Sequence, residues 1–532
     1  MANRGSVTAS CPQPEPQALA LARLFSPLSR LLVSGGDERL SIERASGRNA
    51  YGCYPLPNSD VVALSSSTAT TISEPAYLRT EKARDDLVRN ALTSGLAAAF
   101  DQRLDGVRWE LRTQLKLDPA TQILFSSSGT DSQQQVLLLL RQVFGASTSC
   151  IVVGADQTGR GSLYTARGQH FGNRTAQGHV VSKGCAVGRN SGNAIGITLI
   201  GEDGAFRGEG ETDALVLAAV DAEVKAGRNV VLEIMAASKL GWSAPSSACL
   251  DVIEARWPLQ VQIVVDACQM RMPRSRLNAH LSRGHVVLLT GSKFFGGPPF
   301  SGASLWPHDL HTRISAIEAA PEGLSAYASR EDVPVGWFRL RGVLPSSPNF
   351  GQWLRWEAAL LEMQSYYALP AAWRHDALSR LATAIPAMIS SVSGLELVAP
   401  YNRDAAMPAT IFSFFLRSAE RRLELRDATL LYRALLDEKV ATLGDRVCQI
   451  GQPVDLPMGI VLRLAIGARS LVEAFSEDAS LNQLLAKVRV VLCGIGERLG
   501  LVPWPPTSCR SAGDGVAAEA AAWGPAVTPP LP

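Results

Sequence analysis

The sequence predicts an α/β fold in which a large domain with a mostly parallel sheet is followed by a smaller α+β domain. Short β-branched runs without polar alternation recur between helical stretches from about residue 77, as expected for strands buried on both faces. The chain of 532 residues is too long for one simple core, and its 46% apolar and 19% charged residues are ordinary for globular proteins. After about residue 350, helices outweigh strands. These observations favour two layered domains over a repeat or fibrous structure.

The individual elements are predicted in chain order. Residues 19–33 form an apolar stretch that Arg23, Pro27 and Arg30 interrupt, which indicates an amphipathic helix too short to span a bilayer. In the large domain we expect helical stretches at 77–117, 131–144 and near 246–257, with strands at 122–129, 150–156, 229–242, 261–267, 285–291 and 302–307. In the small domain we expect helical stretches at 351–393, 426–441 and 470–499, with strands at 410–417 and 459–467.

Composition sets the expected domain boundaries. Residues 1–17 and 504–532 are polar or rich in Pro, Gly and Ala without periodicity, so we expect both ends to be disordered. Residues 18–60 are expected to join the small domain. Residues 61–345 are expected to form the large domain, and residues 346–503 the small one.

Charge and cysteine usage exclude several classes of function. The net charge of +2 comes without a basic stripe, so nothing points to nucleic acid or to an anionic membrane as a partner. The nine cysteines are scattered, with no CxxC pair and no histidine spacing suited to zinc. We therefore expect reduced thiols, a cytoplasmic protein and no metal site.

A Gly-containing loop precedes the predicted helix at 131–144. In "SSSGTDS" (126–132), Gly129, Thr130 and Asp131 stand at the helix N-terminus, where free N–H groups and the positive end of the helix dipole suit a phosphate. The same residues also fit an ordinary N-cap with a tight turn.

Two further loops place charged residues at the ends of apolar strands. Asp266 follows "VQIVV", and a carboxylate at that depth needs a cation or hydrogen-bond donor, such as a protonated ring nitrogen, a helix cap or a salt-bridge partner. Lys293 follows a hydrophobic strand and precedes a Gly/Pro turn, so its amine is screened from water and suited to attack an aldehyde. Thr290 and Ser292 flank Lys293 with hydroxyls that can reach a phosphate. An isolated lysine, in contrast, is usually a surface residue.

An arginine interrupts a strand of the small domain. Arg463 in "VLRLAIG" is either a structural ion-pair partner or a bidentate seat for a carboxylate, and Arg446 is the next candidate for the second role. A phosphate cradle, a carboxylate for a pyridinium, a lysine and this arginine together are what pyridoxal 5′-phosphate chemistry requires. The sequence therefore predicts pyridoxal phosphate as cofactor, with Asp266 and Lys293 holding opposite ends of it.

Between about residues 60 and 500 the sequence resembles the fold-type I pyridoxal-phosphate enzymes, and within them the class V aminotransferase group that includes cysteine desulfurases and selenocysteine lyases. The motifs that carry the resemblance are "SSGTD", "VDACQ" (265–269), "TGSKFFGGP" (290–298) and "SSPNF" (346–350). The resemblance implies that Asp266 pairs with the pyridine nitrogen and that Gln269 contacts the phenolic oxygen. It also implies that Lys293 forms the internal aldimine, with Thr290 and Ser292 at the phosphate.

The family resemblance further implies a homodimer. In the family, the segment similar to "SSPNF" reaches the phosphate of the neighbouring subunit, which makes Ser347 a candidate for that contact.

The sequence departs from the family pattern at three places. The loop at 154–171 has no aromatic ring where the family stacks one on the cofactor. In "RVCQIGQPV", which we interpret as a loop, Gly451 stands near the position of the desulfurase cysteine, and Cys448 is displaced from it on the same loop. In "ASKLG", Ser238 stands where the family has an asparagine near the cofactor.

These features lead to three functional hypotheses. The first is a pyridoxal-phosphate enzyme of the class V aminotransferase type that acts on an amino acid. The second is a cysteine desulfurase or a lyase that eliminates sulfur from a cysteine-like substrate, with Cys448 as sulfur acceptor. The third is a catalytically silent binding protein on the same fold.

Overall fold

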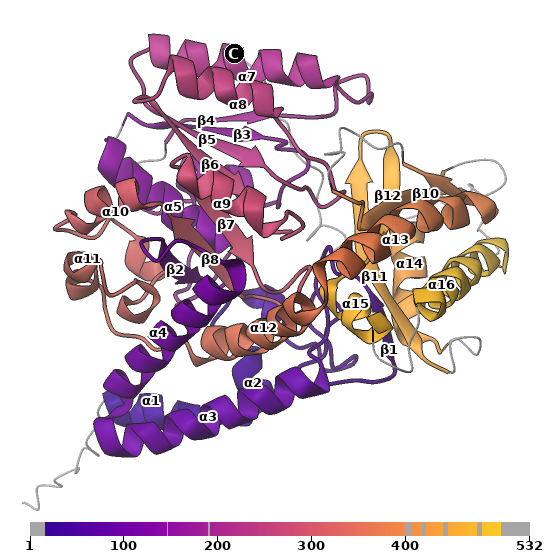
Figure 1. Cartoon of the computed structure of the whole chain (residues 1–532), viewed down its shortest axis with the longest axis horizontal. Coiled ribbons are helices and arrows are strands. Elements are labelled where there is room, and N and C mark those ends of the chain that lie inside the picture. Colours follow the sequence, from indigo (N-terminus) through magenta and orange to yellow (C-terminus); the bar gives the residue numbers. More distant parts are fainter. Residues whose placement is uncertain are drawn as a thin grey trace, which may run out of the picture.

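A seven-stranded sheet forms the centre of the larger part of the molecule (Figure 1). Its spatial order is β2-β8-β7-β6-β5-β3-β4, and only β8 runs antiparallel to its neighbours within the described sheet. The prediction of a mostly parallel sheet is therefore confirmed. The strands are β2 (Gln122–Ser126), β3 (Ser149–Val153), β4 (Ala194–Ile197), β5 (Val230–Met235), β6 (Val261–Asp266), β7 (Val286–Thr290) and β8 (Gly302–Trp306).

The structure is a computed structural model. It describes residues 16–145, 147–189, 192–398, 407–417, 422–439, 445–475 and 481–501. The predictions of disorder at 1–17 and 504–532 lie outside the described residues, apart from two residues of the first helix. Within the described ranges, no helix combines the length and the apolar character that a bilayer crossing requires.

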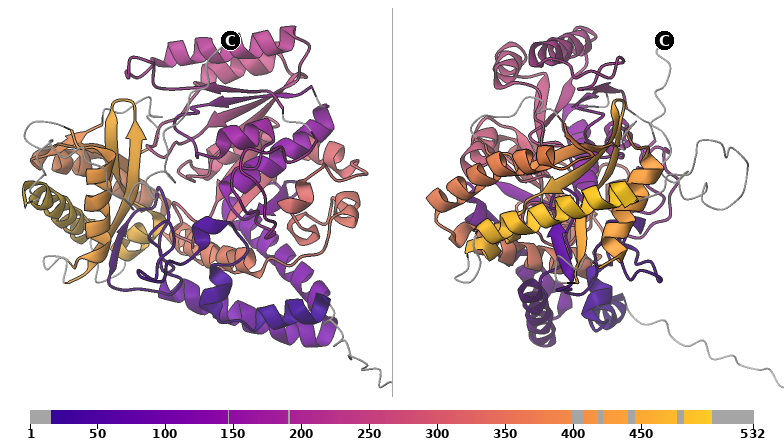
Figure 2. Two further views of the ribbon diagram at one scale, coloured as in Figure 1. Left: turned by 180° about the vertical axis from the view of Figure 1, so that it is seen from behind. Right: turned by 90° about the vertical axis from the view of Figure 1, so that its right-hand side faces the viewer.

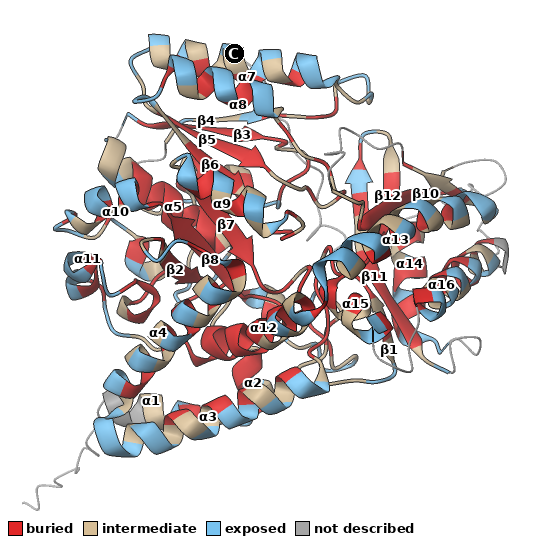
Figure 3. Cartoon of the chain, in the orientation of Figure 1, coloured by how far each residue is buried: buried red, intermediate tan, exposed pale blue. Residues whose placement is uncertain are grey.

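Helices cover both faces of the large sheet, which is why its strands are buried nearly throughout (Figure 3). Helices α5, α10 and α11 share one core with one face, and α7, α8 and α9 pack on the other. The helices of this part are α3 (Glu74–Ser94), α4 (Leu96–Leu115), α5 (Gly129–Phe144), α6 (Ser162–Arg167), α7 (Glu209–Lys225), α8 (Ser247–Arg256), α9 (Arg274–Ser282), α10 (His308–Ser315), α11 (Phe338–Val343) and α12 (Phe350–Ala368).

A five-stranded sheet of order β1-β11-β12-β10-β9 forms the smaller part (Figures 1 and 2). Its strands are β1 (Val61–Leu64), β9 (Leu395–Leu397), β10 (Ile411–Leu416), β11 (Val447–Leu456) and β12 (Gly459–Ala465). Its helices are α13 (Ala371–Ser391), α14 (Leu425–Asp437), α15 (Ala468–Phe475) and α16 (Leu481–Leu501), and α1 (Pro16–Leu24) and α2 (Leu28–Leu32) precede both parts in the chain.

Several predicted boundaries shift for local reasons. The helical stretch at 77–117 is two helices, because Gly95 between them has a φ of 80°. The stretch at 351–393 breaks at Pro370 and the N-terminal one at Pro27. The assignment of residues 61–64 to the large domain was wrong, because this strand pairs in parallel with β11 of the small sheet.

Candidate active site

The two residues singled out by the sequence lie at the same edge of the large sheet. Asp266 is the last residue of β6, and Lys293 follows the neighbouring strand β7 by three residues. In the register of the sheet, Asp266 lies opposite Met235 on one side and Leu288 on the other. Both side chains are half-buried. This edge carries the carboxyl ends of the parallel strands, where α/β proteins bind their ligands.

The N-terminus of α5 meets the loops that follow β6 and β7. A Cβ atom on Gly129 would lie 2.6 Å from the Cys268 sulfur, a contact that only glycine avoids. The Thr290 hydroxyl donates a 2.8 Å hydrogen bond to the Cys268 carbonyl. The backbone N–H groups at the start of this helix therefore lie next to the loops that carry Asp266 and Lys293, a suitable place for a phosphate.

Asp131 is hydrogen-bonded to Ser128, the N-cap residue of α5. Its backbone N–H donates to the Ser128 hydroxyl at 3.2 Å, and its carboxylate accepts from the same hydroxyl at 2.5 Å. Burial raises the pKa of Asp131 to about 7. Thr130 packs against the loop after β3, since a Cβ on Gly161 would lie 2.7 Å from its methyl group. Ser292 is buried beside Lys293. The interpretation of this loop as a helix cap is therefore compatible with its interpretation as a phosphate site.

The side chains of Gln269 and Ser238 are held by nearby backbone. Gln269 donates from Nε2 to the Ser67 carbonyl at 3.0 Å. The Ser238 hydroxyl accepts from the N–H groups of Leu240 and Trp242 at 3.0 and 3.1 Å, which fixes the turn after β5. The cofactor contacts predicted for these two residues stay predictions.

The Ser/Thr-rich segment at 65–71, which follows β1, borders the site and was missed by the sequence analysis. Thr68 accepts a 3.1 Å hydrogen bond from Arg463, and the Ser66 hydroxyl accepts one of 2.9 Å from Arg271. Arg271 also donates to the Ile466 carbonyl at 2.9 Å, so it ties the loop after β6 to the small domain. The unusual run "SSSTATT" was the available signal.

Gln157 lies in the loop where the expected aromatic ring is absent. Its side chain is buried next to Gly154, and its Oε1 atom has no hydrogen-bond partner among the described residues. The Ser67 hydroxyl is also buried and has no hydrogen-bond partner among the described residues. Buried polar atoms are rarely left unsatisfied, so these two oxygens are available for hydrogen bonds with a ligand.

The chain at 34–54 runs from the start of α5 to the small sheet. At one end, the Gly35 carbonyl accepts a 2.7 Å hydrogen bond from Ser127, which precedes α5. At the other end, the Ala50 carbonyl accepts one of 2.7 Å from Gln452 of β11. This segment therefore connects the start of α5 to the small domain.

Arg39 is the charged centre of this connecting segment. Its guanidinium donates to the Asp37 carboxylate at 2.9 and 2.5 Å and to the Tyr51 hydroxyl at 3.2 Å. It also lies 4.8 Å from the centre of the Phe300 ring. Asp37 is buried and close enough to Asp131 to raise its pKa. The local sequence pattern did not predict this cluster.

Arg463 is buried on β12, where its guanidinium contacts the turn after β5. It donates from Nη1 to the Lys239 carbonyl at 3.2 Å and from Nη2 to the Gln452 carbonyl at 2.9 Å. Its Nε atom has no partner, and no carboxylate within the described ranges forms an ion pair with it. Burial lowers the pKa of Arg463 to about 10. A Cβ on Gly451 would lie 3.1 Å from Nε, so the glycine makes room for this guanidinium.

The other two small-domain candidates lie at the start of β11. Arg446 precedes the strand, five residues before Gly451, which is paired with Arg463. At roughly 3.3 Å per residue this places Arg446 on the order of 16 Å along the strand from that pairing. The prediction that Cys448 sits on a loop was wrong, because it is a fully buried strand residue. Burial raises the pKa of its thiol to about 12, which disfavours the reactive thiolate.

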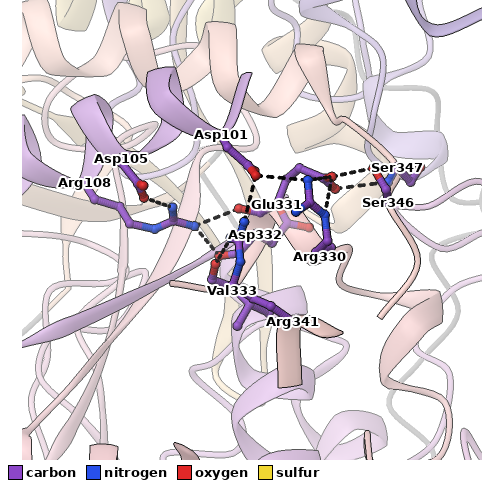
Figure 4. Close-up of polar contacts among 10 residues, drawn as sticks. All are labelled: Asp101, Asp105, Arg108, Arg330, Glu331, Asp332, Val333, Arg341, Ser346 and Ser347. Atoms are coloured by element: carbon purple, nitrogen blue, oxygen red, sulfur yellow. Dashed lines mark hydrogen bonds and ion pairs between the residues drawn. The ribbon is translucent and has the colours of Figure 1, made fainter. Parts of the chain in front are cut away.

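Ser347 borders a partly buried network of ion pairs (Figure 4). Its N–H donates to the Glu331 carboxylate at 3.1 Å, and the neighbouring Ser346 hydroxyl donates to the same carboxylate at 2.6 Å. Arg330 joins Glu331 to Asp101, with ion-pair distances of 3.1 and 3.0 Å. This network fixes the segment that holds Ser347. Its contact with a neighbouring subunit stays a prediction.

A second buried carboxyl group lies beneath Asp266. Glu233 on β5 pairs with Val264, two residues before Asp266 on the same face of the sheet. Its carboxylate accepts a hydrogen bond from Gln133 of α5. Burial, and after it the charge of Asp266, raises the pKa of Glu233 to about 8. Glu233 is therefore protonated at neutral pH.

This raised pKa predicts a pH-dependent stability. The folded state stabilises the neutral form of Glu233. This contribution to the free energy of unfolding is fully present below about pH 4.5 and is lost as the pH rises towards 8. Relative to Glu233→Gln, the wild-type free energy of unfolding is expected to fall by about 2 to 4 kcal/mol between pH 5 and pH 9. Urea unfolding of both proteins across this range measures it. Glu318→Gln, an exposed control, should show no such trend, and a pH-independent difference for Glu233→Gln would contradict the assignment.

Comparisons with known proteins bear on the fold. No protein-family profile matches the chain, and no curated protein sequence matches it. Among solved structures, a NifS-like protein superimposes with a TM-score of 0.50 at 13% identity, over 81% of this chain and 99% of the other. The cysteine desulfurase CsdA from Escherichia coli superimposes with a TM-score of 0.51 at 12% identity, over 82% and 94% of the two chains.

At such low identity, these similarities concern the arrangement of the backbone. They span the large sheet and the small domain together, because nearly the whole length of each solved structure is matched. The chain therefore shares the overall fold of the NifS-like protein and of CsdA.

Proposed function

We propose that this chain is a pyridoxal-phosphate-dependent enzyme that acts on an amino acid, of the class V aminotransferase type. The observation that carries the proposal is the placement of Asp266 and Lys293 at one sheet edge, next to the N-terminus of α5. The close approach of Gly129 to Cys268 and the unsatisfied oxygens of Gln157 and Ser67 fit a bound cofactor there.

The chemistry of each residue suggests its role in the proposed reaction. Pyridoxal phosphate supplies an electron sink for negative charge at the substrate α-carbon. Lys293 Nζ would hold the cofactor covalently and then take up and return the α-proton. Asp266 would keep a proton on the ring nitrogen, while the first N–H groups of α5 would bind the phosphate. Arg463 would bind the substrate carboxylate through a pair of parallel hydrogen bonds.

The alternative is removal of sulfur from a cysteine-like substrate, as the name of CsdA says of that protein. It would use the same lysine, aspartate and arginine. Cys448 is a poor sulfur acceptor because it is buried and its thiol has a raised pKa. The geometry therefore suits a lyase that eliminates sulfur from the substrate without a protein thiol as acceptor.

Two measurements test the proposal. The purified chain is titrated with pyridoxal phosphate, and the spectrum of the bound cofactor is followed as each amino acid is added. The products then separate the alternatives: a keto acid with the amine retained on the cofactor indicates transamination, and pyruvate or sulfide indicates a lyase. A chain that binds no pyridoxal phosphate would rule out both.

Arg463→Lys is expected to weaken amino-acid binding tenfold or more without changing cofactor binding. Lysine cannot reproduce the planar fork of the guanidinium, and each charge-assisted hydrogen bond contributes about 1.5 to 3 kcal/mol. The measurement compares spectral titrations with an amino acid and with its decarboxylated amine. Arg446→Lys, the matched control, should leave this preference unchanged. If Arg463→Lys prefers the amino acid as strongly as wild type does, the carboxylate is bound elsewhere.

A further inference from the structure

A carboxyl group lies within the loop that the proposed function assigns to the cofactor phosphate. Asp131 is the third residue of α5, and only 2% of it is exposed. Its Oδ2 atom lies 2.5 Å from the hydroxyl oxygen of Ser128, the N-cap residue of the helix. The Asp131 N–H donates to the same hydroxyl at 3.2 Å. The carboxyl group is therefore turned back towards the N-terminus of α5, the place where a phosphate would bind.

The cations around Asp131 are bound to other groups. Arg39 forms its ion pair with Asp37 at 2.5 Å, and Arg355 donates its hydrogen bonds to four backbone carbonyls. The other titratable groups that act on Asp131 or respond to its charge are the buried Asp37 and the Tyr327 hydroxyl. Among the residues that the structure describes, none forms an ion pair with Asp131. Its carboxyl group thus has a hydroxyl, and no cation, as its direct partner.

This surrounding favours the neutral acid. Burial is the largest cause that raises the pKa of Asp131 to about 7, and the charge of Asp37 is the next, while Ser128 and Arg39 act in the opposite direction. At pH 8 the carboxyl group of the cofactor-free protein is therefore mostly ionised. A phosphate monoester is a dianion at this pH, since its second pKa is about 6. A negative charge placed next to a carboxyl group disfavours the ionised form of that group.

We infer that Asp131 is neutral when the cofactor phosphate is bound at α5, so that binding of pyridoxal phosphate takes up a proton from solvent onto the Asp131 carboxylate. The inference rests on the proposed function and concerns the regulation of that site by pH. The neutral acid keeps its hydrogen bond with Ser128, because a hydroxyl and a protonated carboxyl group can each donate. Cofactor affinity is then highest below about pH 7 and falls by up to about tenfold for each pH unit above it.

The test counts the protons that are taken up when the cofactor binds. The cofactor-free chain is titrated with pyridoxal phosphate at pH 8 by isothermal titration calorimetry, in two buffers that differ in ionisation enthalpy. Wild type is expected to take up more protons than Asp131→Asn, by up to about one for each cofactor bound. The comparison cancels the protons that the cofactor and Lys293 exchange in both proteins. Asn keeps an acceptor for the Ser128 hydroxyl but cannot take up a proton.

The dissociation constant gives a second readout. At pH 9, Asp131→Asn should bind pyridoxal phosphate about tenfold or more tightly than wild type does, whereas at pH 6 the two proteins should differ little. Pyridoxal, which lacks the phosphate, should show no such difference at either pH. Asp309→Asn is the matched control, because Asp309 is an exposed carboxylate in the first turn of α10. This variant should take up as many protons as wild type.

The outcomes distinguish this inference from the function on which it rests. If wild type and Asp131→Asn bind pyridoxal phosphate with equal proton uptake, the inference is wrong and the proposed function stands. The same conclusion follows if the difference persists with pyridoxal, because the phosphate would then not be its cause. If wild type binds no pyridoxal phosphate, the proposed function fails and the inference with it. Asp131→Ser, a second neutral replacement, gives the same comparison if Asp131→Asn does not fold.

Discussion

Lys293→Ala is expected to abolish covalent attachment of pyridoxal phosphate and to lower α-proton exchange by about 10²- to 10⁴-fold or more. Lys293 is the lysine that follows β7, next to the strand that ends in Asp266. The loop around it is fixed independently of its side chain, because Gly297 N–H bonds to the Gly291 carbonyl at 3.0 Å. The variant should therefore fold. Borohydride reduction, followed by mass mapping of peptides, locates the labelled lysine in wild type.

The structure supplies a demanding control for this assignment. Lys239 lies within electrostatic range of Lys293, and its lowered pKa of about 8 makes its amine available near neutral pH. Lys239→Ala should still be labelled at Lys293. If the label appears on Lys239 in wild type, or if Lys293→Ala still attaches the cofactor irreversibly after reduction, the assignment of Lys293 is wrong.

The large domain could be predicted because its signals are local. Each buried parallel strand is a short apolar run, and the residues just after it lie at one edge of the sheet. Asp266, Lys293 and the glycine-bearing start of α5 were therefore found from the sequence, and the structure brings them together. Gly129 was recognised in the sequence as part of a loop before a helix. In the structure its lack of a Cβ lets the start of that helix approach Cys268.

Strands β1 and β11 of the small sheet could not be predicted in the same way, although β10 and β12 were. Strand β1 is four residues long, and its partner β11 begins at Val447, so no local pattern announces the pairing. The segment "RVCQIGQPV" contains glycine and proline and was interpreted as a loop. In the structure it lies on β11, where the register shifts between Gly451 and Val454. Such a bulge absorbs residues that a regular strand disfavours.

The residues that complete the site from other parts of the chain were missed for a related reason. Arg39, Ser67 and Gln157 become recognisable only through their neighbours, since each is buried or paired by contacts that the folded chain creates. Lys239 was noticed in the sequence only as part of the turn that holds Ser238.

Asp266→Ala is expected to retain pyridoxal phosphate at Lys293 but to lose α-proton exchange by about 10²-fold or more. Asp266 accepts a hydrogen bond of 3.0 Å from the Cys268 N–H, which aims its carboxylate along the end of β6. Without a negative charge there, nothing would hold a proton on the ring nitrogen of bound pyridoxal phosphate, and negative charge at the substrate α-carbon would be less well stabilised. Exchange of the α-proton into deuterated water, followed by NMR on a saturating amino acid, measures the effect.

Two further variants separate charge from packing in this prediction. Asp266→Asn keeps an acceptor for the Cys268 N–H but lacks the charge, so it should be nearly as slow as Asp266→Ala. Glu233→Gln changes the neighbouring carboxyl group, which is already protonated at neutral pH, and should exchange at close to the wild-type rate. Near-normal exchange in Asp266→Asn would show that the charge is not required, and the role of Asp266 would then be to hold the Cys268 loop in place.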